Sequence, residues 1–484
     1  MTVEGGQVWQ RLSPRMLLVH PVHEVLRQIP LLIGSVVLGS ATGNPMWTLF
    51  GLALVVGYGV ARWFTTTYRI NPEEVQLRTG VLQRKVLSVP RNRIRSVSTD
   101  ARLLHRLLGL TVLRLSTGQE AKRDGAFALD AVEAGQVPRL RAILLAESLA
   151  PAEQEVAAPG RELARWQPSW LRYSPLSFTG LAMIAAAVGL VYQAGAGAAL
   201  QNSRLARSGL AAVERFGVVA SLIVAAVVVL AASVVLSVLR SLATYGNLVL
   251  RRDAEVLHLE HGLLRLRERT FDMRRLRGGT LREPLLVRLF GGARVDAVMT
   301  GVDGSGEASL LLPPCPRATA EAVLSELIAG PEVVTGPLRA HGRVATRRRW
   351  TRALALPAVL LVAMVVGYSW TPVWLWPVWV VLTVCCALLA VDRSRALGHR
   401  VDARWLVARA GSLDRRRDCI AAAGIIGWTV RQTLMQRRAG VATLIAATAA
   451  GVKRYRVLDV PADLAWTIAA AASPWVADND WADR

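Results

Sequence analysis

Long apolar stretches alternate with polar, arginine-rich stretches along this 484-residue chain. A helix needs roughly 20 mainly apolar residues to cross the hydrocarbon core of a bilayer, and six stretches approach that length. They are Ile29–Ser40, Met46–Ala61, Leu176–Ala194, Gly217–Leu239, Ala353–Tyr368 and Val373–Val391. Short links close the first and last pairs, and residues 195–216 join the middle pair. The pattern therefore predicts a membrane protein with six transmembrane helices in three hairpins.

The charged residues are segregated from these apolar stretches. Although 52% of the chain is hydrophobic and 19% charged, 50 of the 58 Lys and Arg residues fall in Arg69–Arg172, Arg240–Arg352 and Arg393–Arg456. The links inside the three hairpins hold only three Arg. Because basic residues are retained on the cytoplasmic side, we expect the three blocks and both termini to be cytoplasmic, at the cell membrane. We expect no cleaved signal peptide, since a small-residue cleavage site is missing near the start.

The net charge of +23 raises the question of nucleic-acid binding. Nucleic-acid domains concentrate their basic residues on a recognisable module with base-stacking aromatic residues, which we do not find in the sequence. Positive-inside topology and attraction to anionic phospholipids account for the charge more simply. We therefore expect a lipid bilayer as partner and no nucleic acid.

The first basic block has the pattern of a small β domain. The runs TTTYRI, EEVQLRTG, VLQRKVLSVP and RNRIRSVSTD alternate in polarity, are rich in Val, Ile and Thr, and are separated by turn residues. Further strands are predicted at Thr111–Ser116 and Ala126–Leu129, and a helix at Val137–Glu147. The other blocks end with similar helices, at Ala318–Ile328 and Ala462–Ala472. Each block is thus predicted to form about 80 residues of short strands followed by one helix.

The three blocks are copies of one another. Shifting the sequence by 182 and by 331 residues superposes the same residue types without gaps. The superposed sets are Gly80, Gly262 and Gly411; Gly109, Gly291 and Gly440; Arg106, Arg288 and Arg437; Arg69, Arg251 and Arg400; Lys85, Arg267 and Arg416; and Leu82, Leu264 and Leu413. We interpret the Gly and Arg106 sets as structural, with Gly80 adopting a positive φ between two strands.

Three motifs of the first copy carry a family resemblance: the strand pair meeting at Gly80, the VP-x-x-RI-x-SV stretch Val89–Val97, and the RLLGL element Arg106–Leu110. The copy resembles the bacterial membrane-attached pleckstrin-homology-like (PH-like) domains, formerly of unknown function. Hairpin plus domain, three times over, is similar to the large three-domain type of that family, often found beside a smaller one-domain relative. The second copy departs at FDMRRLRGG and the third at Cys419–Trp428. The resemblance implies partly open β-barrels, each plugged by a C-terminal helix, and no known catalysis.

These observations predict alternating membrane and PH-like segments. The predicted segments are 1–64, N-terminal segment and first hairpin; 65–150, first PH-like domain; 151–173, linker; 174–241, second hairpin; 242–330, second PH-like domain; 331–349, basic linker; 350–391, third hairpin; 392–474, divergent third PH-like domain; and 475–484, tail.

Motifs for catalysis or for cofactor binding are weak. The pair His20 and His23 stands alone, and His258 and His261 would point to opposite faces of a strand. Gly301–Glu307 is Gly-rich but lacks the Lys-Ser/Thr of a phosphate loop, so a β-turn is favoured. The four cysteines have no metal-ligand spacing. We expect no enzymatic activity, no cofactor and no metal.

Basic residues on the repeated blocks are the best candidates for contacts with anionic lipids or with a partner. These candidates are Arg69, Lys85, Arg251, Arg267, Arg400 and Arg416, together with Arg347, Arg348 and Arg349 before the last hairpin. Topology, anchoring and solubility are the ordinary alternative explanation for these charges, and for the last three we expect a position at the headgroups.

The sequence as a whole predicts a non-enzymatic scaffold of the bacterial cytoplasmic membrane. Expected partners are anionic phospholipids and either a smaller one-domain relative or further copies of the chain. A role in envelope stress, such as protection against membrane-active peptides, is one hypothesis. The alternatives are a component of a lipid or peptide export system with a partner ATPase, and a membrane stress sensor. Coupled transport is disfavoured because the predicted spans hold no ionisable residue between their ends.

Overall fold

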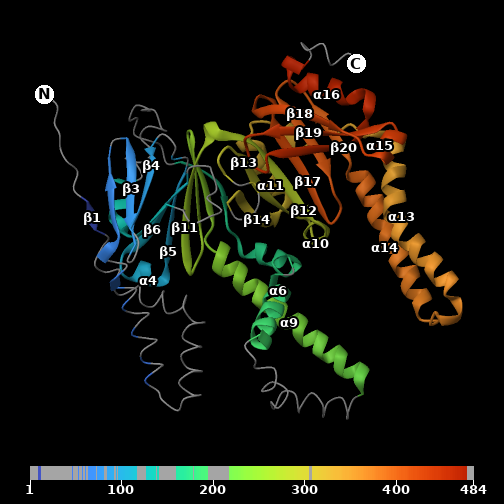
Figure 1. The fold of residues 1–484 in the computed structure, drawn as a ribbon, viewed down its shortest axis with the longest axis horizontal. Coiled ribbons are helices and arrows are strands. Elements are labelled where there is room, and N and C mark those ends of the chain that lie inside the picture. Colours follow the sequence, from blue (N-terminus) through green and yellow to red (C-terminus); the bar gives the residue numbers. More distant parts are fainter. Residues whose placement is uncertain are drawn as a thin grey trace. The chain divides into compact units, whose positions relative to one another are not determined.

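The chain contains two compact units, one formed by Met1–Arg165 with Ala243–Arg275 and the other by Trp166–Leu242 with Leu276–Arg484. The structure, a computed structural model, is shown in Figure 1. It describes residues 64–116, 127–140, 160–193 and 217–476, with short gaps inside these ranges, together with residues 9–11 and isolated positions between 46 and 61.

The first copy of the repeat, here called module 1, consists of two antiparallel sheets in the first unit. One sheet has the order β1 (Gln10–Arg11), β2 (Thr67–Ile70), β3 (Glu74–Thr79), β4 (Lys85–Pro90). The other contains β5 (Ser96–Arg102), β6 (Leu110–Ser116) and β7 (Phe127–Glu133), with the short helix α4 (Leu103–Leu107) between β5 and β6. Val75, Val97 and Phe127 belong to the shared core between the sheets, because alternate residues of each strand point inward.

The second sheet of module 1 does not end at β5. Its order is β7-β6-β5-β11-β10-β9-β8, so it continues into the first strands of the second copy, module 2. Those strands are β8 (Arg161–Arg165), β9 (Val249–Asp253), β10 (Val256–His261) and β11 (Arg265–Asp272). Strands β5 and β11 pair antiparallel, from Arg265 opposite Arg102 to Arg269 opposite Ser98. We call this pairing junction 1.

The second unit repeats this arrangement. A six-stranded sheet has the order β14-β13-β12-β17-β16-β15 and joins module 2 to the third copy, module 3. Its strands are β12 (Leu276–Pro284), β13 (Gly292–Met299), β14 (Leu310–Pro316), β15 (Gly398–Val401), β16 (Trp405–Ala410) and β17 (Asp414–Ala421). The pairing of β12 with β17, from Gly278 opposite Ile420 to Pro284 opposite Asp414, is junction 2.

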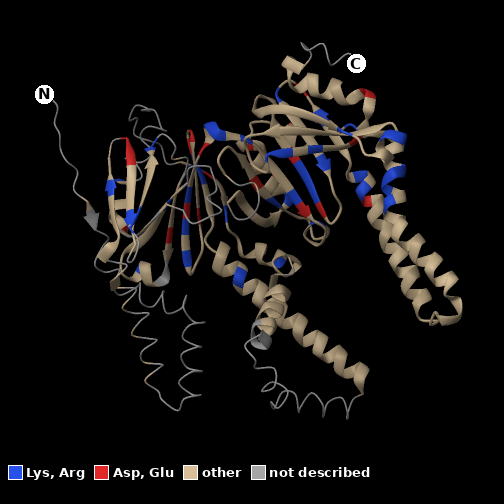
Figure 2. Cartoon of the chain, viewed as in Figure 1, with Lys and Arg blue, Asp and Glu red and all other residues tan. Residues whose placement is uncertain are grey.

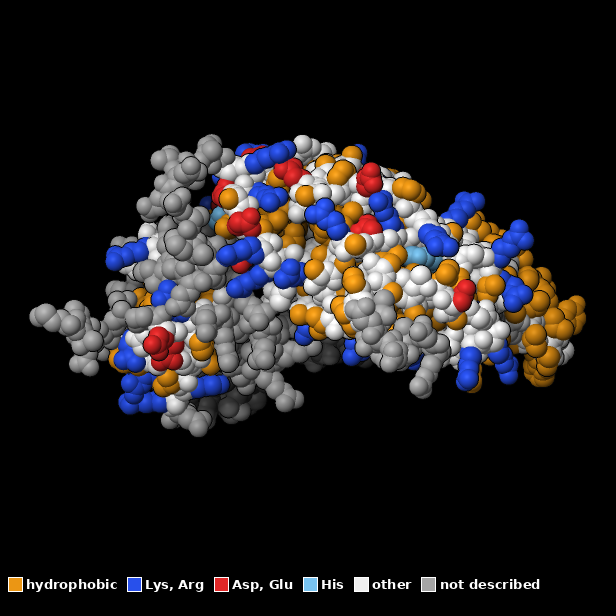
Figure 3. All heavy atoms as spheres, turned by 90° about the horizontal axis from the view of Figure 1, so that it is seen from above, with side chains coloured by type: hydrophobic (Ala, Val, Ile, Leu, Met, Phe, Trp, Pro, Cys, Tyr) orange, Lys and Arg blue, Asp and Glu red, His pale blue; other side chains and the backbone are white. Residues whose placement is uncertain are grey.

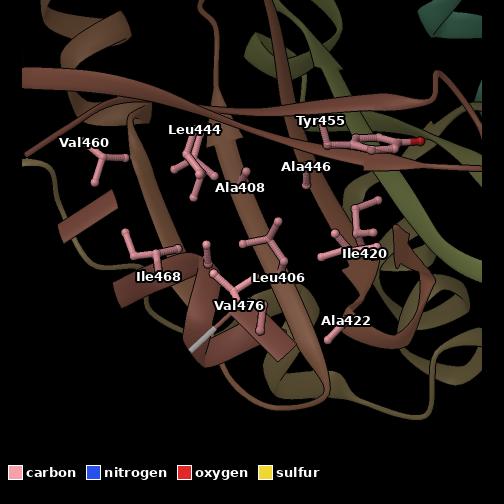
Figure 4. Packing of buried hydrophobic residues seen from close by; sticks show 14 of the residues in the cluster. Leu406, Ala408, Ile420, Ala422, Leu444, Ala446, Tyr455, Val460, Ile468 and Val476 are labelled. Atoms are coloured by element: carbon pink, nitrogen blue, oxygen red, sulfur yellow. The ribbon is translucent and has the colours of Figure 1, made fainter. Parts of the chain in front are cut away.

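Module 3 is completed by a three-stranded sheet and a helix. The strands are β18 (Ile425–Arg431), β19 (Val441–Thr448) and β20 (Arg454–Pro461), and the helix is α16 (Ala465–Ala472). Leu406 and Ile420 from one sheet meet Leu444 from the other and Ile468 from the helix in one core (Figure 4). Shorter helices in this unit are α10 (Leu285–Leu289), α11 (Arg317–Leu327), α12 (Pro331–Thr335) and α15 (Leu434–Arg438).

Three helices are long and apolar enough to cross a membrane: α9 (Val218–Tyr245), α13 (Gly342–Val366) and α14 (Leu375–Ala396). Few of their residues are buried in the isolated protein, 11% or less of each apolar stretch, which suits helices whose solvent is lipid. A fourth candidate combines the segment Pro168–Ser177 with Thr179–Gly189 across a 53° bend. Helices α13 and α14 form a hairpin that projects from module 3, and hydrophobic side chains cover its far end (Figure 3).

The expectation of six spans is therefore met only in part. Among the described residues three helices qualify, and the predicted span Leu176–Ala194 is instead the 15-residue helix α6 (Thr179–Gln193) after a bend. Pro168 and Pro175 begin short 3₁₀ helices ahead of it, which break the helix path. The first predicted hairpin and the link 195–216 lie almost entirely outside the described residues.

The repeat is confirmed by strand register as well as by residue type. Thr79 pairs with Lys85, His261 with Arg267, and Ala410 with Arg416, so the equivalent strands of the three modules pair at equivalent positions. Gly80, which follows Thr79, has a φ of 124°, as expected from its turn position, and Gly262 and Gly411 have 109° and 103°. The helices predicted at the ends of the second and third copies correspond to α11 and α16.

Candidate functional site

The third hairpin joins module 3 without a flexible tether. Helix α14 ends at Ala396 and β15 begins at Gly398, so only Leu397 lies between them. Arg409 of β16 donates hydrogen bonds to the carbonyl oxygens of Ala396 and Arg395, at 2.9 and 3.1 Å. These carbonyls are otherwise unpaired at a helix end, where the helix dipole also favours a cation. The strand is thus fixed to the end of the helix.

A second contact at this point is made by Asp392 of α14. Its carboxylate accepts hydrogen bonds from Arg288 at 2.8 Å and from Arg415 at 2.6 Å. Arg288 lies on α10 of module 2 and Arg415 on β17 of module 3. Asp392 therefore ties both sides of junction 2 to the end of the hairpin.

The start of α13 is held by a buried acid. Asp459 of β20 is 2.6 Å from Arg349 and 3.3 Å from Arg348, and it accepts a hydrogen bond from Gln436 at 2.7 Å. Arg349 is 7% exposed, so it is inside the protein and not at the headgroups, contrary to our expectation from the sequence. Arg347 alone of the three is exposed. Figure 2 shows basic residues gathered where this hairpin meets the sheets and none along its far half.

Two buried histidines lie beside this acid. His341 Nδ1 donates to the carbonyl oxygen of Leu458 at 2.7 Å, and His399 Nδ1 lies 2.8 Å from His341 Nε2. Burial lowers the pKa of both imidazoles, and that of His399 to about 4. Both rings are therefore neutral near pH 7, with His399 donating to His341. The pair links β15 to the start of α13.

A polar cavity of about 560 Å³ opens between β12, β13, β17 and β20. Four arginines and three aspartates line it: Arg282, Arg416, Arg454, Arg456, Asp296, Asp414 and Asp418. Arg282 is 3.1 Å from Asp296, and Arg416 is 2.8 Å from Asp414. The cavity charges largely compensate one another, so Arg416 is not presented as an isolated basic contact.

The short helices α4, α10 and α15, each of which connects two strands of its module, expose apolar side chains. Leu107 on α4 is 81% exposed, Leu289 on α10 is 69% and Leu434 on α15 is 79%. Helix α15 lies against the start of the third hairpin, since Arg348 donates to Thr433. At the end of α9, the backbone N–H of Leu263 donates to the carbonyl oxygen of Ala243, and that of Gly262 donates to Gly246 just beyond the helix. The tips of α15 and α10 therefore lie where the third hairpin meets the β modules, since Arg288 of α10 also donates to Asp392 of α14.

The other basic candidates are not brought into one site. Arg69 lies over the Trp9 ring and donates to Gln76. Arg400 is 3.2 Å from Glu332. Arg267 is opposite Asp100 in junction 1, Arg251 is opposite His258 in the β9–β10 pair, and Lys85 lies exposed on β4.

The repeat of four strands, a short helix and two strands, following apolar helices, defines a protein of PH-like β modules associated with a membrane. The chain belongs to the bacterial PH domain family, which matches residues 24–148, 206–329 and 351–470. Each match reaches back from the β strands into the preceding apolar region. The comparison with curated proteins finds no match, and neither does the comparison with solved structures.

Proposed function

We propose that this protein is a non-enzymatic scaffold that holds its PH-like modules against the inner surface of the bacterial cytoplasmic membrane. The proposal rests on the connection between α14 and β15, where one residue and the Arg409 hydrogen bonds replace a linker. A module attached in this way stays at the level where the helix leaves the bilayer. The arginine distribution supports the cytoplasmic side.

Two contributions would hold the modules on the lipid. A basic residue near an anionic surface contributes about 1 kcal/mol. Transfer of an exposed leucine from water into the interface is worth up to roughly 2 kcal/mol. Insertion of Leu107, Leu289 and Leu434 would therefore contribute as much membrane-binding free energy as several arginines. We propose that these tips enter the headgroup region and that anionic phospholipids add attraction without a specific lipid pocket.

The full-length protein in lipid nanodiscs tests this proposal. An environment-sensitive fluorophore is attached at Leu434→Cys, with Cys385 and Cys386 replaced by alanine, since Cys315 and Cys419 are buried. The matched control is Val452→Cys, which is exposed and follows the far end of β19. We expect emission from position 434, not 452, to shift to the blue. Equal spectra at the two positions would contradict the proposal.

The physiological role that we propose for the scaffold is maintenance of the envelope under attack by membrane-active peptides. Deletion should then increase sensitivity to such peptides, and expression of the intact chain should restore resistance. Unchanged sensitivity across a broad panel of membrane-active agents would remove this role while leaving the scaffold itself untouched.

A further inference from the structure

Junctions 1 and 2 pair equivalent strands of the repeat in the same register. In junction 1 Ser98 is opposite Arg269, and in junction 2 Thr280 is opposite Asp418. Thr280 is the repeat equivalent of Ser98, and Asp418 that of Arg269, under the offsets found in the sequence. In each junction the strand that precedes the short helix of one module (β5 or β12) thus pairs with the strand of the next module that is equivalent to β4 (β11 or β17). The interaction is carried mainly by backbone hydrogen bonds, because the side chains differ.

Each junction pairs a strand of the β5 type with a strand of the β4 type, and one strand of each type is left at a sheet edge. Among the described residues, β4 of module 1 ends the sheet β1-β2-β3-β4, and β18 of module 3 ends the sheet β18-β19-β20. Strand β4 is equivalent to β11 and β17, and β18 to β5 and β12. Val86 on β4 is 55% exposed and Ile426 on β18 is 69% exposed. Exposed apolar edges of this kind are templates for pairing with another strand.

We propose that β18 of one copy of this chain pairs antiparallel with β4 of a second copy, so that the internal junction is repeated between molecules. Continuing the register of junctions 1 and 2 places Thr429 opposite Leu87 and Val430 opposite Val86. Residues Ile426–Arg431 then pair with Lys85–Pro90, which covers β4 completely. The contact joins unlike surfaces, so it links copies head to tail.

The second copy is the occupant that the structure favours, because each chain carries both halves of the junction. No new surface is required, and the two internal junctions show that strands of these types hold together in this register. This inference stands apart from lipid contact by the apolar tips, since β4 and β18 pair through their edges.

Disulfide formation between two differently tagged copies in native membranes tests the register. With Cys385 and Cys386 replaced by alanine, one copy carries Val86→Cys and the other Val430→Cys; a second pair carries Leu87→Cys and Thr429→Cys. Opposite pairs alternate between two geometries, of which one suits a disulfide, so at least one combination should yield a mixed-tag dimer. The control combines Val86→Cys with Thr429→Cys, which lie on opposite faces, and we expect roughly ten-fold less product.

Three results would overturn the proposal. One is the absence of a mixed-tag dimer from both matched pairs, or an equal yield from the control. Another would come from a chain that carries both Val86→Cys and Val430→Cys, if its disulfide formed only within the chain and gave a product of monomer mass. The third is capture of a different protein, such as a smaller relative, in place of the second copy.

Discussion

Junctions 1 and 2 share a backbone pairing but differ in the charges that accompany it. In junction 1 Asp100 of β5 is 5% exposed and is held by Arg265 and Arg114. In junction 2 Asp418 of β17 lines the polar cavity and accepts a hydrogen bond from Thr280 at 2.7 Å. Burial acts to raise the pKa of both carboxyls. For Asp418 burial is the dominant effect, so its pKa is raised. For Asp100 the neighbouring arginines outweigh burial, so its pKa is lowered. The backbone therefore specifies the junction, and the side chains only modulate it.

The largest effect should come from Gly278, which lies in junction 2 with a φ of 140°. A Cβ added there would lie 1.9 Å from the carbonyl oxygen of Cys419 on the partner strand. We expect Gly278→Ala to cost more than about 3 kcal/mol, by backbone strain and loss of the pairing. Hydrogen exchange at β12 and β17 measures the loss.

Gly427 is the matched control, because it has the equivalent position on the edge strand β18. An added Cβ there meets nothing closer than the Ala447 Cβ at 3.9 Å. We expect Gly427→Ala to change the free energy of unfolding by less than about 1 kcal/mol. Equal losses of stability at the two glycines would mean that the close approach of β17 to Gly278 does not cause the loss.

Removal of the acid from junction 1 should have the next largest effect. Asp100→Ala leaves Arg265 and Arg114 without their shared carboxylate. We expect a loss of about 2 kcal/mol, at the lower end for a buried pair because both arginines are partly exposed. Urea unfolding of the first unit, followed by hydrogen exchange at β5 and β11, measures it. Glu162→Ala, which removes an exposed partner of Arg165, should cause no measurable change.

The acid of junction 2 should respond in the opposite direction. Asp418→Asn preserves an acceptor for Thr280 and removes a carboxyl whose charged form is disfavoured by burial. We expect a stabilisation of up to about 1 kcal/mol at neutral pH, measured by urea unfolding. Destabilisation of similar size would show that the carboxylate is needed in its charged form.

The dependence on pH sharpens this contrast. The pKa of Asp100 is lowered on folding, so its contribution is present above the unfolded value of 3.8 and is lost as the pH falls through the lower folded pKa. The pKa of Asp418 is raised, so its cost is present above the folded pKa and disappears as the pH falls toward 3.8. Asn variants at the two sites, compared with the parent by hydrogen exchange over pH, should therefore diverge with opposite sign.

The smallest effect should appear at the proposed contact between copies. In its register Arg431 is opposite Lys85, just as Arg282 is opposite Arg416 in junction 2. Like charges opposite each other cost a few tenths of a kcal/mol, so Arg431→Glu should raise the mixed-tag disulfide yield roughly two-fold. Adding Lys85→Glu should cancel the gain, and an unchanged yield in both variants would indicate a different register.

Most strands of module 1 were predictable because polar and apolar residues alternate along them. The runs around Val75 and Val97 correspond to β3 and β5, and α11 and α16 lie where apolar periodicity indicated helices. Strand β8, in the expected linker, was missed because RELAR contains no β-branched residue. The family was also recognised from the first copy, and the match to bacterial PH domains confirms it.

The junctions and most of the site could not be predicted in the same way. Asp100 and Arg265 are 165 residues apart, and sheet continuation through an edge leaves no periodic signal in either strand. Arg348 and Arg349 were expected at the headgroups, because Asp459, their partner, follows more than 100 residues later and is an ordinary strand residue in the sequence. Pairing between distant charges is a product of the fold, which local patterns do not encode.

Because only one residue separates α14 from β15, the third hairpin and module 3 are connected rigidly. A helix in a bilayer changes its tilt when the thickness of the hydrocarbon core changes. With Arg409 closing the helix end and Asp392 bound to Arg288 and Arg415, that rotation cannot be absorbed at the connection. Thinning of the membrane by an inserted peptide would therefore turn the module and, through β17, strain the strand pairing beside it.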